Sequence, residues 1–364
     1  MKSTVESSVS SAVTRRGDSG DQAGYVDEIA AVRHRDHQLI TAVRTQEATL
    51  KLIAWNVEGT GAITRTGDSG EQAGHATYID IASHISGTRL VTSCADSGGS
   101  LKLISWDASD DGSVITRLGD SGSQAGTARE TSIIAVSQDR LVTAVRTEEG
   151  DLKLIGWRLN VSDGSLTRLA DSGDQAGSVG EIALSLMTDG TVVTSVRDST
   201  GSLKLISWAV SDTAITRLSD SASLAGPLAA TRIRAVVDPM GHLVTAVQMA
   251  GNLRLIVWRV DNSGKFTRLT DSGEHAGETV GHDISLAAGR IITGVRTKGS
   301  ALKVIMWQTA SEGTVTRIGD SASQAGSIDF VVQCEELTTG PPIVTCVKTS
   351  FAENLKLISW SPAA

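Results

Sequence analysis

The sequence predicts an all-β protein, a seven-bladed β-propeller built from four-stranded antiparallel blades. Three observations lead to this fold. A Thr-Arg pair followed by a segment similar to GDSG-x-QAG recurs seven times, and each copy is followed by a segment similar to LKLI-x-W. The period is about 50 residues, which is typical of propeller blades. Between the motifs lie short, β-branched apolar runs. Because the repeats fill the chain, we expect residues 1–364 to form a single domain.

One repeat contains four expected strands. In the first full copy these are 28–33, 38–44, 50–57 and 62–65, here named A, B, C and D. Turn sequences rich in Asp, Asn and Gly, such as 110–113, separate C from D and suit tight hairpins. We therefore expect each blade to be an antiparallel meander, with GDSG-x-QAG connecting strand D of one blade to strand A of the next.

The order of the strands also predicts how the ring closes. The chain begins with a D-type run at 11–15 and ends just after a C-type run at 355–360. We expect residues 11–15 to add as the outer strand of the last blade. Such pairing would cover an edge that is otherwise exposed.

Comparison of the seven copies identifies the residues that are constant. The Arg of Thr-Arg, the Asp-Ser of GDSG and the Ala-Gly of QAG occur in every copy. In a meander, the D-to-A and B-to-C connections lie at the same end of the blade, so GDSG-x-QAG shares a face with the arginines that end strands B. These polar residues either staple neighbouring blades or line equivalent ligand sites in inter-blade clefts. The candidate ligand-binding residues of this face are Gln22, Gln72, Gln124, Gln175, Gln324, Arg44, Arg146, Arg197 and Arg296.

One tryptophan closes strand C in every repeat. Its large amphipathic ring can pack between blades, with its N–H donating to an oxygen, or can form a stacking platform for a ligand. Few other aromatic residues are present, two Tyr and three Phe, so a stacking platform would depend on these tryptophans. We include them among the candidate ligand-binding residues: Trp55, Trp106, Trp157, Trp208, Trp258, Trp307 and Trp360.

Composition and motifs exclude several functions. A net charge of −8 argues against nucleic acid and against an anionic membrane surface as the main partner. No apolar run is long enough to cross a bilayer, so we expect a soluble protein without membrane insertion, in a compartment that the sequence does not define. The cysteines Cys94, Cys334 and Cys346 do not recur with the repeat, and we expect them to be buried. No nucleotide or metal motif is present, so we expect no cofactor and no metal.

The GDSG segment resembles the surroundings of a serine protease nucleophile. A nucleophile needs a base beside it, and no histidine recurs with the repeat. The copies also stay alike, whereas enzymatic propellers gather unlike residues around the central channel. We therefore expect no catalytic residues and no enzymatic activity.

The couplet LVTAVRTEEGDLKLIGW at 141–157, repeated along the whole chain, resembles in outline the strand–turn–strand repeats of bacterial and fungal propeller lectins. The resemblance implies a bacterial repeat protein that binds sugars in clefts between blades, commonly as a homo-oligomer. We therefore expect a non-catalytic, multivalent binding protein whose partner is a carbohydrate or glycoconjugate. The alternative is a protein–protein interaction scaffold, or a structural propeller without a small-molecule ligand.

Overall fold

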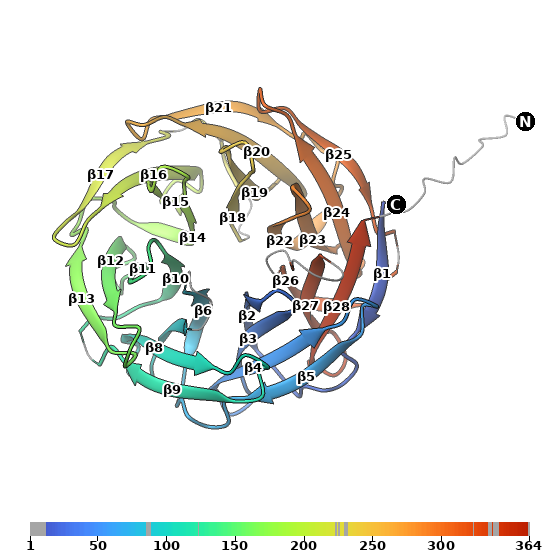
Figure 1. Ribbon diagram of the computed structural model, residues 1–364. Helices are drawn as coiled ribbons and strands as arrows, with labels where there is room; N and C mark the ends of the chain where they lie inside the picture. The colour runs from blue at the N-terminus through green and yellow to red at the C-terminus, as the bar shows by residue number, and fades with distance from the viewer. Residues whose placement is uncertain are drawn as a thin grey trace, which may run out of the picture.

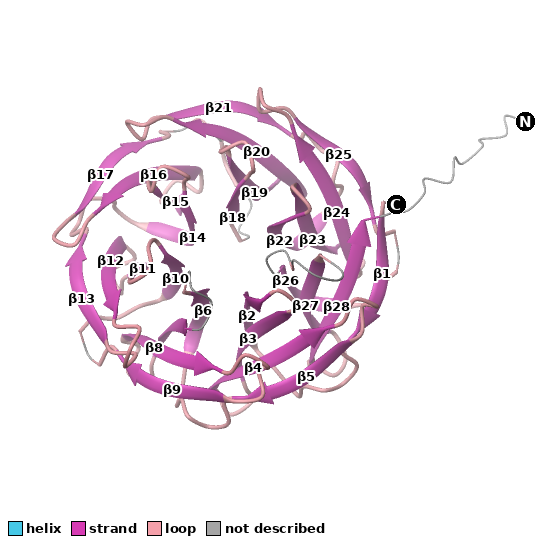
Figure 2. Cartoon of the chain, in the orientation of Figure 1, coloured by secondary structure: helices cyan, strands magenta, loops and turns pink. Residues whose placement is uncertain are grey.

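The strands form a ring of seven sheets around a central axis (Figure 1). The computed structural model describes residues 12–84, 89–122, 124–222, 224, 226–228, 232–322, 324–333, 337 and 342–362. Within these residues every named element is a strand, β1 to β28, and each sheet has four antiparallel strands (Figure 2). The predicted all-β, seven-bladed propeller is confirmed.

Each blade runs from an innermost strand A to an outermost strand D (Figure 1). Blade 1 is β2 (Glu28–Arg35), β3 (Gln38–Arg44), β4 (Leu50–Val57) and β5 (Ile63–Asp68); blade 2 is β6 (Thr77–Ser83), β7 (Arg89–Ala95), β8 (Leu101–Ala108) and β9 (Ile115–Asp120); blade 3 is β10 (Glu130–Ala135), β11 (Arg140–Arg146), β12 (Leu152–Leu159) and β13 (Leu166–Asp171). Blade 4 is β14 (Val179–Leu186), β15 (Val192–Asp198), β16 (Leu203–Val210) and β17 (Ile215–Asp220); blade 5 is β18 (Arg234–Val237), β19 (Leu243–Met249), β20 (Asn252–Val260) and β21 (Phe266–Asp271). Blade 6 is β22 (Thr279–Ala287), β23 (Arg290–Thr297), β24 (Leu302–Thr309) and β25 (Val315–Asp320); blade 7 is β26 (Ile328–Gln333), β27 (Ile343–Thr349), β28 (Leu355–Pro362) and β1 (Val13–Asp18).

The first strand of the chain completes the last blade, as predicted. Strand β1 pairs antiparallel with β28, and Val13 lies opposite Pro362. Residue 11 of the predicted strand lies outside the described residues. The ring is therefore closed by hydrogen bonds between the two ends of the chain.

Every strand D carries a β-bulge that explains the spacing of the Thr-Arg-x-Gly-Asp motif. In blade 1, Trp55 pairs with Arg65 and Ala54 pairs with Gly67, so Thr66 is an extra residue. Side chains three positions apart point to opposite faces of a regular strand, but one inserted residue brings them to the same face. Arg65 and Asp68 consequently form an ion pair. The same pair forms in all seven blades: Arg15–Asp18, Arg65–Asp68, Arg117–Asp120, Arg168–Asp171, Arg217–Asp220, Arg268–Asp271 and Arg317–Asp320.

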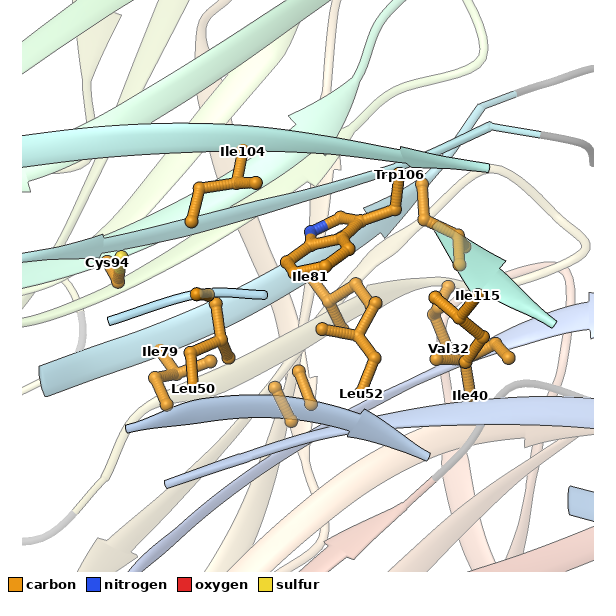
Figure 3. Packing of buried hydrophobic residues seen from close by; sticks show 14 of the residues in the cluster. Val32, Ile40, Leu50, Leu52, Ile79, Ile81, Cys94, Ile104, Trp106 and Ile115 are labelled. Atoms are coloured by element: carbon orange, nitrogen blue, oxygen red, sulfur yellow. The ribbon is translucent and has the colours of Figure 1, made fainter. Parts of the chain in front are cut away.

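The core consists of apolar clusters between neighbouring blades. Figure 3 shows the cluster between blades 1 and 2, where Leu50 and Leu52 of β4 pack towards Ile79, Ile81 and Trp106 of blade 2. The repeated leucine and isoleucine positions of strand C alternate in direction, so each sheet packs against a neighbour on both faces. The ring is thereby held together by interdigitated sheet faces.

Candidate functional site

The repeated Asp-Ser pair fixes the start of each D-to-A connection. Asp68 Oδ1 accepts a hydrogen bond from the Gly70 backbone N–H at 2.6 Å, and Ser69 Oγ accepts one from the Leu52 backbone N–H at 3.0 Å. Burial by itself raises the pKa of Asp68, but the Gly70 N–H and the charges of Arg65 and Lys51 outweigh it, so the net pKa is lowered. The motif is therefore a local brace built on an ionised carboxylate.

The glutamine of QAG joins one blade to the next. Gln72 Nε2 donates to the carbonyl oxygens of Ser69 at 2.7 Å and Ile115 at 3.0 Å, while its Oε1 accepts from the Arg117 backbone N–H at 2.8 Å. The amide thus pairs with the outer edge of β9 as a peptide group would, which covers an unpaired strand edge. Gln22, Gln124, Gln175 and Gln324 make the equivalent bonds to the next strand D. Both ends of these amides are therefore engaged within the protein.

All seven repeated tryptophans lie in the core. Each side chain is 0% exposed, and each Nε1 donates to the Oγ1 of a threonine in strand B, as from Trp106 to Thr92 at 3.0 Å. The set is Trp55, Trp106, Trp157, Trp208, Trp258, Trp307 and Trp360. A ligand in an inter-blade cleft could contact them only if an indole ring left the core.

Two small hollows lie at equivalent inter-blade positions on the face of the D-to-A connections. One has a volume of about 230 Å³ and is lined by Tyr25, Lys51 and Arg65; the other has about 150 Å³ and is lined by His75 and the equivalent Lys and Arg. None of the five repeated glutamines lines either hollow. The clefts that the sequence predicts thus exist in outline, without the predicted glutamine and tryptophan contacts.

The four candidate arginines at the ends of strands B fall into two groups. Arg44 pairs with Asp27 at 3.1 Å and with Glu28 at 3.2 Å, and Arg296 lies 3.6 Å from Asp329. Arg146 and Arg197 form no ion pair with a carboxylate of the described residues, and both line one cavity. The structure therefore brings two of the four together at one place.

This cavity lies in the central channel between the inner strands of blades 1 to 6 and has a volume of about 640 Å³. Its lining comes mainly from the beginnings of β2, β6, β10, β14 and β18, which surround the axis in Figure 1. The charged lining residues are Glu28, Asp80, Arg129, Glu130, Arg146, Glu181, Arg197, Arg232, Arg234 and Asp283. All its cationic residues are arginines, and most of its charged residues belong to the A strands or directly precede them.

Three of the carboxylates hydrogen-bond the inner strands of blades 1, 2 and 3 to the inner strand of the next blade. Glu28 Oε2 accepts from the Ile79 backbone N–H at 2.9 Å, and Glu130 Oε1 accepts from the Ile182 backbone N–H at 3.0 Å. Asp80 Oδ2 accepts from the backbone N–H of Ile133 at 2.9 Å. Burial raises the pKa of Asp80, and burial together with the nearby Glu181 charge raises the pKa of Glu130 to about 7. Glu130 is therefore a carboxyl group of the cavity that can gain or lose a proton near neutral pH.

The arginines of blade 5 lie close to these carboxylates. Arg234 Nε is 3.3 Å from Asp283 Oδ1, and its charge offsets part of the rise in the pKa of Asp80 and of Glu130. The Arg232 guanidinium lies 3.7 Å above the centre of the Phe330 ring. Burial and the adjacent Arg234 charge lower the pKa of Arg232 to about 9. The cavity therefore holds several arginines and several carboxylates in a confined volume, an arrangement that is common at functional sites.

Other chemistry is sparse in the described part of the chain. It contains no group of three or more His, Cys, Asp or Glu side chains placed to hold a metal ion. Nor does it include a helix with the length and hydropathy needed to span a membrane. Cys94 and Cys346 are buried, and burial raises the pKa of Cys94 to about 12, whereas Cys334 lies outside the described residues.

Comparisons with known proteins give likeness in structure alone. No protein-family model matches the chain, and no curated protein matches it. Among solved structures, the periplasmic gluconolactonase of Pseudomonas aeruginosa has a TM-score of 0.59 at 14% identity, over 82% of this chain and 86% of that one. A putative 6-phosphogluconolactonase from Bacteroides fragilis has a TM-score of 0.53 at 13% identity, over 80% and 83%. A chain of the mitotic checkpoint complex has a TM-score of 0.57 at 13% identity, over 96% and 93%. At these identities the fold is what is shared.

These comparisons correct the expected function. The sequence predicts a lectin without enzymatic activity, but the proteins that share the fold include two named as lactonases and one from a protein complex. Lectin binding is therefore not supported, and the exclusion of an enzyme is wrong. That exclusion assumed that all parts of the repeat stay alike. The A strands, however, place unlike residues around the channel, such as Asp80, Glu130 and Arg234.

Proposed function

We propose that this protein hydrolyses a small polar ester, the lactone of a hydroxylated acid, in the cavity of the central channel. The observation that carries the proposal is Glu130, whose carboxyl group lines the cavity with a pKa of about 7. A carboxylate with a pKa near the working pH is well suited to act as a general base. The lactone class comes from the names of the two lactonases that share the fold.

In the proposed reaction, Glu130 accepts a proton from a water molecule as the water oxygen attacks the lactone carbonyl carbon. The charge of Arg234, which acts on Glu130, also stabilises the negative oxygen of the tetrahedral intermediate. When this intermediate collapses, the ring C–O bond breaks and the proton held by Glu130 passes to the departing ring oxygen. The product is the open-chain hydroxy acid.

Hydrolysis of glucono-δ-lactone and of its 6-phosphate, followed with a pH indicator and corrected for the uncatalysed reaction, tests the proposal. We expect kcat to rise with pH through about 7, because Glu130 must be deprotonated to act as a base. Glu130→Gln should lower kcat by about 100-fold or more. The control is Glu71→Gln, which changes an exposed carboxylate of a D-to-A connection and should leave kcat unchanged. No hydrolysis of either lactone by the folded protein would contradict the proposal.

Binding of a protein partner is a second candidate. It is favoured by the likeness over nearly the whole chain to a component of the mitotic checkpoint complex. Phe351, in the B-to-C turn of blade 7, is also 96% exposed, and exposed aromatic side chains are common anchors of interfaces. Photo-cross-linking from position 351 in cells, read by mass spectrometry, tests this candidate. Recovery of the uncross-linked chain alone would count against it.

A further inference from the structure

Three guanidinium groups of the central cavity have no carboxylate partner among the described residues. Arg146 Nη2 donates to the Arg129 carbonyl oxygen at a long 3.4 Å, and Arg197 Nε is buried without a hydrogen-bond partner. Arg232 packs on the Phe330 ring and forms no ion pair with a described carboxylate. A partly buried guanidinium without an anion loses hydration that nothing replaces. The cavity therefore favours entry of a negatively charged group.

Four of the five carboxylates that line the cavity are held by other groups. Glu28, Asp80 and Glu130 use oxygens to accept backbone N–H groups of the next blade, and Asp283 faces Arg234. Burial also raises the pKa values of Asp80 and Glu130, which favours their neutral forms. The fifth, Glu181, also lines the cavity, and its charge acts on Arg232 together with those of Asp283 and Glu130, but none of the five carboxylates forms an ion pair with Arg146, Arg197 or Arg232.

The three arginines come from consecutive blades. Arg146 ends β11 of blade 3, Arg197 lies in β15 of blade 4, and Arg232 lies two residues before the start of β18 of blade 5. Their positions are also fixed by packing. A Cβ atom at position 180 would lie 2.8 Å from Arg197 Nε, so Gly180 lets this guanidinium lie against the backbone, while the Phe330 ring supports Arg232. An anion bound here would meet donors that are already oriented.

We infer that Arg146, Arg197 and Arg232 bind a phosphate monoester group of the ligand in the central cavity. Guanidinium groups match the geometry of phosphate oxygens and can each donate two N–H groups. A phosphate has enough oxygens for three such donors and carries more charge than a carboxylate. This inference deepens the proposed function, on which it rests for the remainder of the ligand, by assigning the substrate to the phosphorylated hydroxy-acid lactones.

Calorimetric titration at low salt tests the inference without any turnover. The probes are glucose 6-phosphate, gluconate and gluconate 6-phosphate, which carry a phosphate, a carboxylate and both. We expect the two phosphorylated probes to bind and gluconate to bind more weakly than either. Arg197→Gln and Arg146→Gln should each weaken binding of the phosphorylated probes by at least about tenfold. Arg296→Gln is a matched control, because Arg296 occupies the same position of strand B in blade 6 as Arg197 does in blade 4 but pairs with Asp329. The affinity of this variant should stay within about twofold of that of the unaltered protein.

Three results would overturn the inference. The first is no binding of either phosphorylated probe, and the second is gluconate binding as tightly as gluconate 6-phosphate. The third is equal weakening by Arg296→Gln and Arg197→Gln, with melting curves confirming that the variants fold. Failure of the anion site can be told apart from failure of the proposed function. Phosphate binding without lactone hydrolysis would overturn the proposed function and keep the anion site. Lactone hydrolysis without any preference for the phosphorylated lactone would keep the proposed function and overturn the anion site.

Discussion

Replacing Gln72 with alanine removes three hydrogen bonds, one within the D-to-A connection between blades 1 and 2 and two that join this connection to strand β9. Each such bond contributes a net of about 0.5–1.5 kcal/mol. Two effects reduce the sum: the freed groups are near solvent and regain water, and the released side chain no longer loses roughly 1.5–2 kcal/mol of rotamer entropy. We therefore expect Gln72→Ala to lower the free energy of unfolding by about 1 kcal/mol.

The chain offers the opposite substitution as well. His275 occupies the glutamine position in the connection from β21 to β22, which lies beside strand β25. Arg317 Nη1 of β25 still donates to the carbonyl oxygen of His275 at 2.6 Å. His275→Gln should restore the missing amide bonds and raise the free energy of unfolding by about the same amount. Guanidinium chloride denaturation followed by tryptophan fluorescence measures both changes, because a buried tryptophan reports on every blade. An unchanged midpoint for Gln72→Ala, or an equal loss in the exposed control Gln46→Ala, would refute the inter-blade role of the glutamine.

Three further outcomes are expected. Thr143→Val should lower the free energy of unfolding by about 1–3 kcal/mol, because Trp157 Nε1 loses its buried acceptor at 2.9 Å; a denaturation midpoint equal to that of the unaltered protein would contradict this. Gly164→Ala should destabilise the protein by about 1–3 kcal/mol in the same assay, because its φ is +77° and a Cβ would collide with Leu118; no loss would mean that this turn can move away. Asp68→Asn should cost stability at neutral pH and progressively less below about pH 4, because a lowered folded pKa gives stabilisation that is complete above the unfolded pKa and lost as pH falls through the folded one. Equal loss at pH 3 and pH 7 would contradict this assignment.

Periodicity predicted the strands because each strand is a local pattern. The runs 38–44 and 50–57 became β3 and β4 with the predicted bounds, and the D-type run at 11–15 closed the ring at β1. The pairing of Arg65 with Asp68 could not be predicted in this way. A spacing of three residues separates side chains on a regular strand, and only the bulge at Thr66 brings them together.

The central cavity was missed because the prediction followed what is constant among the copies. The B strands are nearly identical, and their positions Ser93, Ala246 and Gly294 are equivalent. The inner-strand residues opposite them are Asp80, Arg234 and Asp283, so the same position carries an acid in two blades and a base in a third. Divergence confined to the A strands was the available signal. Which charges meet across the channel depends on ring closure, which brings distant repeats within reach of one another.

The pairing of β1 with β28 has a consequence during translation. The earliest of these strands to leave the ribosome must wait, with its hydrogen-bonding edges unpaired, until residues 355–362 emerge. Blades 1 to 6 are each built from four consecutive strands, whereas blade 7 combines the first strand of the chain with the last three. A circular permutant in which β28 is joined to β1 and the chain is opened inside another blade would move this wait to that sheet, and a permutant opened in a D-to-A connection between two intact blades would remove it. The pairing of β1 with β28 therefore determines when the ring can close during synthesis.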